Sequence, residues 1–96
     1  MPSVVHSVAL TIAGSDSGAS AGIQADLLTF AAHEVFGTTA LTCLTAQNPG
    51  GVTAIEVLPV AFVQEQIQQV HRYFKIAALK TGMLYSAGII AAVHPT

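Results

Sequence analysis

The chain has 96 residues, of which 52% are apolar and only 8% are charged, and its formal net charge is −2. This length suits one small domain, and the three basic residues, Arg72, Lys75 and Lys80, leave no electrostatic footprint for nucleic acid or an anionic membrane. Since an ordinary soluble domain carries about 25% charged residues, we expect part of this surface to be covered by more chain or by a partner.

The single cysteine, Cys43, excludes an internal disulfide framework and a cysteine-rich zinc site. It fits a reducing compartment, so a cytoplasmic location is expected. No stretch approaches the roughly 18 apolar residues that span a bilayer, and the N-terminal segment lacks the charged start of a signal peptide. The apolar composition therefore predicts a buried α/β core.

The first half of the chain alternates between strand and helix patterns. Val4 to Ala13 is apolar and rich in β-branched residues, which predicts a strand buried on both faces and ended by Gly14. From Gly22 to about His33 the apolar residues take a helical period, and Ser20 is the expected N-cap. Thr38 to Ala46 returns to strand composition.

The second half repeats this alternation after the turn at Asn48-Pro49-Gly50-Gly51. Val52 to Leu58 is a short apolar strand, Pro59 opens a helix, and Ile76 to Leu79 is expected to be a third core strand. Ser86 should cap a last helix that Pro95 would stop. The apolar face of the middle helix is Val63, Ile67, Val70 and Phe74. This order predicts an α/β fold with a doubly wound, mostly parallel sheet.

Polar or glycine-rich stretches follow three of the predicted strands. They are Gly14 to Asp16, Gln47 to Asn48 and Lys80 to Met83. In a doubly wound sheet, ligands bind beyond the carboxyl ends of the strands. The sequence therefore predicts that these three stretches meet around one ligand.

The glycines of the first stretch match no common phosphate loop. Gly14, Gly18 and Gly22 fit neither GxGxxG nor a P-loop, which needs a GK[ST] sequence. A strand-to-helix turn with free backbone N–H groups can hold a hydroxyl, amide or phosphate oxygen. A purely structural turn is the alternative.

Side chains near these turns each allow two interpretations. Asp26 is either a ligand contact or a carboxylate favoured by the start of a helix, and Gln47 either stabilises a turn or pairs with the edge of a heterocycle. Met83 is either core or an apolar contact, and Lys80 could simply extend from a strand end into solvent. Asp16 alone is weak evidence for Mg²⁺. Cys43, inside a predicted strand, is expected to be a buried thiol, and the histidines His6, His33, His71 and His94 show no metal-ligand spacing.

Taken together, three segments carry a specific resemblance. "ALTIAGSDSGASAGIQADLLTF", "LTCLTAQNPGGV" and "LKTGML" closely resemble the N-terminal part of the hydroxymethylpyrimidine and phosphomethylpyrimidine kinases of thiamine synthesis. These enzymes belong to the ribokinase-like superfamily, in which bacterial pyridoxal kinases are near relatives. The resemblance runs from about Val8 to Ala92 and implies that residues 1–96 are the substrate-binding portion of one larger three-layer α/β/α domain.

The resemblance implies ATP- and Mg²⁺-dependent phosphorylation of 4-amino-5-hydroxymethyl-2-methylpyrimidine and of its monophosphate, by an enzyme that is a homo-oligomer at full length. Position by position, Gly14 is similar to the backbone wall of the pyrimidine pocket and Met83 to its apolar wall. Asp26 and Gln47 are similar to the polar contacts of the ring. A small-molecule pyrimidine is the partner implied, with neither nucleic acid nor a membrane.

The sequence departs from the family pattern in three ways. Ala19-Ser20 stands where many relatives have Gly-Gly, and Lys80-Thr81-Gly82-Met83 stands where KIGM is more frequent. The glycine-rich anion hole, the catalytic Asp or Cys and most ATP contacts of the family do not occur through Thr96, so no catalytic residue is assigned and a truncated, inactive form is expected. A pyridoxal kinase and a non-catalytic pyrimidine-binding or regulatory remnant are the alternatives.

Overall fold

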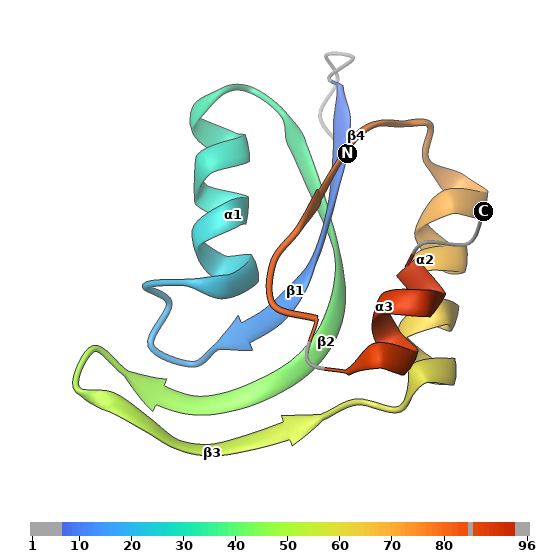
Figure 1. Cartoon of the computed structure of the whole chain (residues 1–96). Coiled ribbons are helices and arrows are strands. Elements are labelled where there is room, and N and C mark those ends of the chain that lie inside the picture. The colour runs from blue at the N-terminus through green and yellow to red at the C-terminus, as the bar shows by residue number, and fades with distance from the viewer. Residues whose placement is uncertain (1–6, 85, 94–96) are drawn as a thin grey trace.

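The computed structural model describes residues 7–84 and 86–93 and contains one four-stranded sheet flanked by helices (Figure 1). In chain order the elements are β1 (Val8–Asp16), α1 (Gly22–Ala32), β2 (Phe36–Asn48), β3 (Gly51–Val57), α2 (Val60–Tyr73), β4 (Ile76–Thr81) and α3 (Ala87–Val93). The predicted order of strands and helices is thus confirmed.

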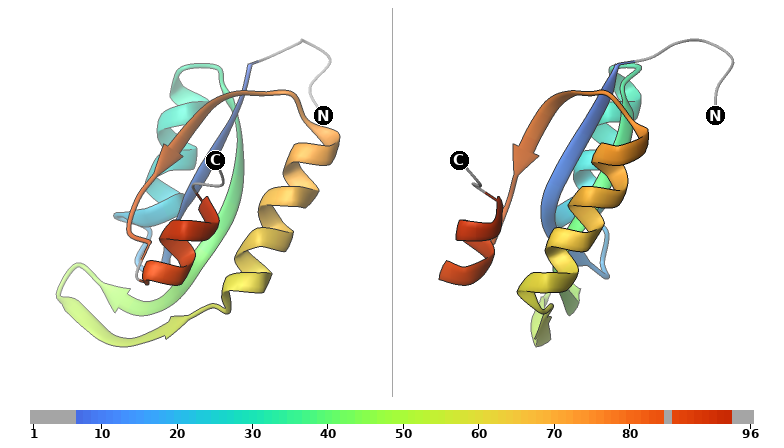
Figure 2. Two further views of the ribbon diagram at one scale, coloured as in Figure 1. Left: turned by 45° about the vertical axis from the view of Figure 1, so that its right-hand side comes forward. Right: turned by 90° about the vertical axis from the view of Figure 1, so that its right-hand side faces the viewer.

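The sheet has the strand order β3-β2-β1-β4. β1 pairs in parallel with β2 and with β4, whereas β2 and β3 form an antiparallel hairpin. Figure 2 shows α1 on one face of the sheet and α2 with α3 on the other. The sheet is therefore mostly parallel and doubly wound, as predicted.

The core lies around the central strand β1. Leu10 and Ile12 are fully buried, together with Ala40 of β2, because β1 has a neighbouring strand on each edge and helices over both faces. On α2, Val63 of the predicted apolar face is buried, whereas the polar residues Gln64, Glu65, Gln68, Gln69 and Arg72 of the helix are exposed. The amphipathic pattern predicted for α2 is confirmed.

β4 differs from the predicted core strand. It pairs only with β1, and five of its six residues are exposed, including Leu79 at 55%. Its apolar composition indicated burial, but a strand at the edge of the sheet has no neighbour on its second side. The prediction of a core strand at 76–79 is therefore wrong within the part of the chain described.

The start of α1 also differs from the prediction. The N-cap is Ala21, which makes no side-chain capping bond, and Ser20 is not the cap. The Ser20 hydroxyl donates instead to the carboxylate of Asp16 (3.1 Å), as do the backbone N–H groups of Ser20 and Ala21. Asp16, four residues before Ser20, satisfies these backbone groups. It belongs to β1, which continues three residues beyond the predicted end at Ala13.

Two non-glycine residues flanking α1 have a left-handed backbone. Ala19 has φ 61° before the helix, and Glu34 has φ 59° after it. After the end of α1, the N–H of Glu34 donates to the carbonyl of Ala31, and the N–H of Val35 donates to the carbonyl of Phe30. These two hydrogen bonds form a Schellman motif, in which the place that Glu34 takes here is usually occupied by glycine. At the last helix, Ser86 caps as predicted, since its hydroxyl accepts from the N–H of Ile89. Pro95 lies outside the described residues.

Candidate functional site

A cavity of about 180 Å³ lies at the carboxyl ends of β1 and β4, against β2. All three predicted stretches contribute to it, together with the start of α1. Its lining is Ala13, Gly14, Ser15, Asp16, Ala21, Gly22, Cys43, Thr45, Gln47, Lys80, Gly82 and Met83. The structure therefore brings Gly14, Gln47 and Met83 to one cavity, from segments far apart in the chain.

The register of the sheet is interrupted beside this cavity. Ala13 pairs with Leu41 and Ser15 with Leu44, so that two residues of β2 stand opposite the single residue Gly14. Gln66 of α2 satisfies the backbone there, because its side-chain amide donates to the Leu41 carbonyl and accepts from the Leu41 N–H. Such bulges re-aim side chains at the ends of strands.

The glycine spacing in the first stretch is explained by contacts between backbones. A Cβ on Gly22, whose φ is +64°, would overlap the carbonyl oxygen of Gly14. A Cβ on Gly18 would lie 2.8 Å from the Cα of Asn48. Two of the three glycines therefore allow the loop to lie directly on β1 and on the end of β2, and the loop forms one wall of the cavity.

The carboxylate of Asp16 organises this loop. It is only 2% exposed and accepts hydrogen bonds from the N–H groups of Gly18 (2.7 Å), Ser20 (3.1 Å) and Ala21 (2.8 Å). Desolvation by itself raises the pKa of Asp16, but these hydrogen bonds together outweigh it and hold the pKa below its ordinary value. Asp16 is therefore a charged, structural residue of the cavity wall.

Gln47 is held by its backbone and by its side chain. Ser17 donates to the Gln47 carbonyl (2.6 Å) and accepts from the Gln47 N–H (2.7 Å). The side-chain amide of Gln47 lies beside Thr45, with the Thr45 hydroxyl 2.8 Å from Oε1. The polar group that the second stretch presents to the cavity is thereby fixed in place.

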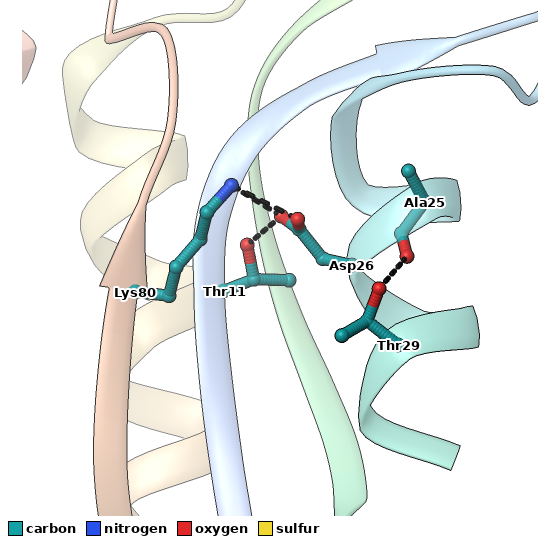
Figure 3. A network of polar contacts seen from close by, with 5 residues as sticks. All are labelled: Thr11, Ala25, Asp26, Thr29 and Lys80. Carbon is teal, nitrogen blue, oxygen red and sulfur yellow. Dashed lines mark hydrogen bonds and ion pairs between the residues drawn. The ribbon is translucent and has the colours of Figure 1, made fainter. Parts of the chain in front are cut away.

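Asp26 occupies a different position from Gly14 and Gln47. It lies on α1 and is not among the residues that line the cavity. Its carboxylate accepts from the Thr11 hydroxyl (2.6 Å) and is 2.9 Å, through both oxygens, from the ammonium of Lys80 (Figure 3). Lys80 does line the cavity. Asp26 thus borders the site through Lys80, and its direct contact with a ligand stays a prediction.

Sequence reasoning missed Thr45 and Ser17, and it placed Lys80 in a predicted stretch without assigning it a partner. The interpretation of Lys80 as a side chain merely extending into solvent is wrong, because it pairs with Asp26 across 54 residues of sequence. Its place between a strand and Gly82, in a chain with only three basic residues, was the available signal. No comparable signal marked Thr45 or Ser17, whose partners follow from the fold.

The remaining candidates from the sequence are Cys43, Met83 and the histidines. Cys43 is fully buried, as expected, and lies against the cavity. Met83 is 63% exposed at the rim, with its carbonyl accepting from Thr42. Among the residues described, no three His, Cys, Asp or Glu side chains group as metal ligands, and no helix is long and apolar enough to cross a membrane. His6 and His94 lie outside those residues.

Parallel strands between two helical layers define an α/β domain of the doubly wound class, and its cavity lies at the carboxyl ends of these strands, where ligands bind in that class. The solved structures similar to it are ribokinase-like kinases. A phosphomethylpyrimidine kinase from Clostridium difficile matches with a TM-score of 0.87 at 45% identity, over 91% of this chain and 38% of that one. A Bacillus subtilis pyridoxal kinase, solved as an ADP complex, matches with a TM-score of 0.85 at 38% identity, over 93% and 34%.

Sequence comparison identifies the family. The phosphomethylpyrimidine kinase family model matches residues 16–96. The hydroxymethylpyrimidine/phosphomethylpyrimidine kinase of Synechococcus elongatus is 55% identical over 89 residues, which is 93% of this chain and 34% of that protein. The Haemophilus influenzae enzyme of the same name is 55% identical over 84 residues, 88% of this chain and 31% of that protein. The chain belongs to the phosphomethylpyrimidine kinase family, and it spans about a third of the length of these relatives.

Proposed function

We propose that residues 1–96 form the pyrimidine-binding part of a kinase that phosphorylates 4-amino-5-hydroxymethyl-2-methylpyrimidine and its monophosphate in thiamine synthesis. The observation that carries this proposal is the single cavity shared by Gly14, Gln47 and Met83, in a chain of this family. Its volume of about 180 Å³ suits one small aromatic ring.

Each side of the cavity supplies a contact that a flat heterocycle needs. The backbone at Gly14, without a Cβ, permits close approach to a ring face, and Met83 adds an apolar surface at the rim. The amide of Gln47 offers a hydrogen bond to the ring edge. Asp26, positioned by Thr11 and Lys80, adds a charged group next to the cavity. Polar pairing of this kind rejects analogues that lack the matching groups.

ATP and Mg²⁺ are the cofactors proposed for the complete reaction. Neither a phosphate-binding glycine loop nor a group of three metal-ligating side chains occurs among the described residues, so the residues present do not fit these groups. Phosphoryl transfer depends on positioning and on stabilising charge at the transferred group. We therefore assign residues 1–96 to one substrate-binding unit, without a catalytic residue, and expect no ATP-dependent turnover from this polypeptide alone. A cytoplasmic location and homo-oligomer formation at full length complete the proposal.

Calorimetric titration with 4-amino-5-hydroxymethyl-2-methylpyrimidine tests the site. Gln47→Ala and Asp26→Ala should each weaken binding at least about tenfold, the loss of one hydrogen bond to a buried polar edge. Gln69→Ala is the matched control, because Gln69 lies exposed on α2. Unchanged affinity in both site variants would refute the assignment. Tighter binding of pyridoxal than of the aminopyrimidine would favour a pyridoxal kinase, the activity named for the Bacillus subtilis structure.

A further inference from the structure

The hydroxyl group of Thr45 lies between two oxygen atoms that both require a proton from it. Thr45 Oγ1 is 2.7 Å from the carbonyl oxygen of Ser15 and 2.8 Å from Oε1 of Gln47. A threonine hydroxyl has one proton to donate and two lone pairs that accept. With both oxygens placed in this way, one of the two contacts would bring oxygen against oxygen without a hydrogen between them.

The two partners differ in their freedom to resolve this conflict. The Ser15 carbonyl can only accept, and it is fixed in β1 directly after the bulge at Gly14. The Gln47 amide can exchange its oxygen and nitrogen by a half-turn about its last side-chain bond, since the two ends have nearly the same shape. Thr45 then donates to Ser15 and accepts from Nε2 of Gln47, and both short contacts become hydrogen bonds.

We propose that Thr45 is a positioning residue that holds the Gln47 side chain with its amide nitrogen toward Thr45 and its amide oxygen toward the cavity. Within the described part of the chain, the Thr45 hydroxyl is the side-chain amide's hydrogen-bond partner, so Thr45 decides which end faces inward. Ser17 meanwhile fixes the Gln47 backbone through two hydrogen bonds. The amide therefore has a defined place and a defined polarity.

This polarity specifies the ligand edge that the cavity accepts. An amide oxygen pairs with a hydrogen-bond donor, such as the exocyclic amino group of an aminopyrimidine, whereas it repels the carbonyl oxygen of an oxopyrimidine. This consequence rests on the proposed function. The orientation of the amide itself does not, because it follows from Thr45 and Ser15 alone.

NMR spectroscopy of the whole ¹⁵N-labelled chain tests the orientation without any ligand. The Gln47 side-chain N–H₂ pair is assigned by its disappearance in Gln47→Glu. We expect nuclear Overhauser contacts from one of these protons to the Thr45 side chain, and a changed N–H₂ shift with faster solvent exchange in Thr45→Val. Thr45→Ser, which keeps the hydroxyl, should preserve the native signals.

Thr53→Val is the matched control. The hydroxyl of Thr53, on β3, also donates to a backbone carbonyl, that of Ala46, which precedes Gln47 on β2. This substitution should leave the Gln47 N–H₂ pair unchanged. An N–H₂ pair without contacts to Thr45, or one insensitive to Thr45→Val in a variant whose backbone spectrum remains folded, overturns the proposal.

Titration with matched amino- and oxopyrimidines tests the consequence. The native chain should bind the 4-amino compound at least about tenfold more tightly than its 4-oxo analogue, the discrimination expected of one well-oriented amide. Thr45→Val should reduce this ratio to near one, while Thr45→Ser and Thr53→Val retain it. Absence of pyrimidine binding together with the expected N–H₂ contacts would refute the proposed function and support the role of Thr45. Binding with a preference unaffected by Thr45→Val would refute the role of Thr45.

Discussion

The ion pair between Lys80 and Asp26 joins β4 to α1, and a double-mutant cycle measures what it contributes to folding. The Lys80 ammonium lies 2.9 Å from both carboxylate oxygens, and the side chains are 49% and 15% exposed. Coulomb's law at that separation gives about 1.4 kcal/mol in bulk water, and a lower effective dielectric increases this value. Ordering of the lysine side chain and screening oppose it. We therefore expect a coupling free energy of about 1 kcal/mol.

The cycle uses urea denaturation of the native chain, Asp26→Asn, Lys80→Met and the double variant. Asparagine keeps an oxygen for the Thr11 hydroxyl, so the cycle isolates the charge interaction. Coupling should fall by about half between about 0.02 M and 0.5 M salt, because half of Lys80 is exposed to solvent. The pair Arg72–Glu65, 4.0 Å apart with both side chains more than half exposed, is an internal control expected to couple weakly. Single variants whose effects add within about 0.3 kcal/mol at low salt would refute the reasoning.

The other predictions concern backbone strain and protonation around the glycine loop. Ala19→Gly and Glu34→Gly should each stabilise the chain by about 0.5–1 kcal/mol in the same urea assay, because both residues have a left-handed φ; a loss of stability would contradict this. Gly22→Ala should destabilise by about 2 kcal/mol or more, because its Cβ meets the carbonyl of Gly14, and near-native stability would contradict the overlap. The pKa of Asp16 is lowered in the folded state, so its stabilisation is present above about pH 4 and is lost as pH falls through the folded pKa. The stability difference between native chain and Asp16→Asn should therefore narrow in thermal melts below about pH 4, and a constant difference would refute this.

Local patterns in the sequence predicted the order of elements, because each element carries its own periodicity. The apolar run before Gly14 and the helical spacing of Val63 and Ile67 depend only on neighbours along the chain. The exposure of β4 could not be predicted in this way. Leu79 has the composition of a core strand, and its 55% exposure follows from the position of β4 at an edge of the sheet, which is a property of the whole arrangement.

The candidate site was predictable to the same extent. Strand ends mark where Gly14, Gln47 and Met83 lie, and the parallel topology brings them to one cavity. The partners of these groups were not predictable, since hydrogen bonds such as that from Thr11 to Asp26 depend on distances set by packing. The resemblance supplied the role proposed for Asp26, but it gave no indication that a lysine 54 positions later would hold its carboxylate.

Under the proposed function, the pairing of charges around the cavity favours a ligand whose ring is neutral. The ammonium of Lys80 is compensated by Asp26 at 2.9 Å, and the carboxylate of Asp16 is enclosed by donors of its own loop. Neither charge is left without a partner, so a charge on the ring itself, as distinct from a phosphate substituent, would have to compete with contacts already formed and would lose its hydration on entry. A ligand with a neutral ring avoids that cost, and Gln47 offers a hydrogen bond to its edge. We therefore expect discrimination among such ligands to depend on the direction of the Gln47 amide more than on the net charge of the site.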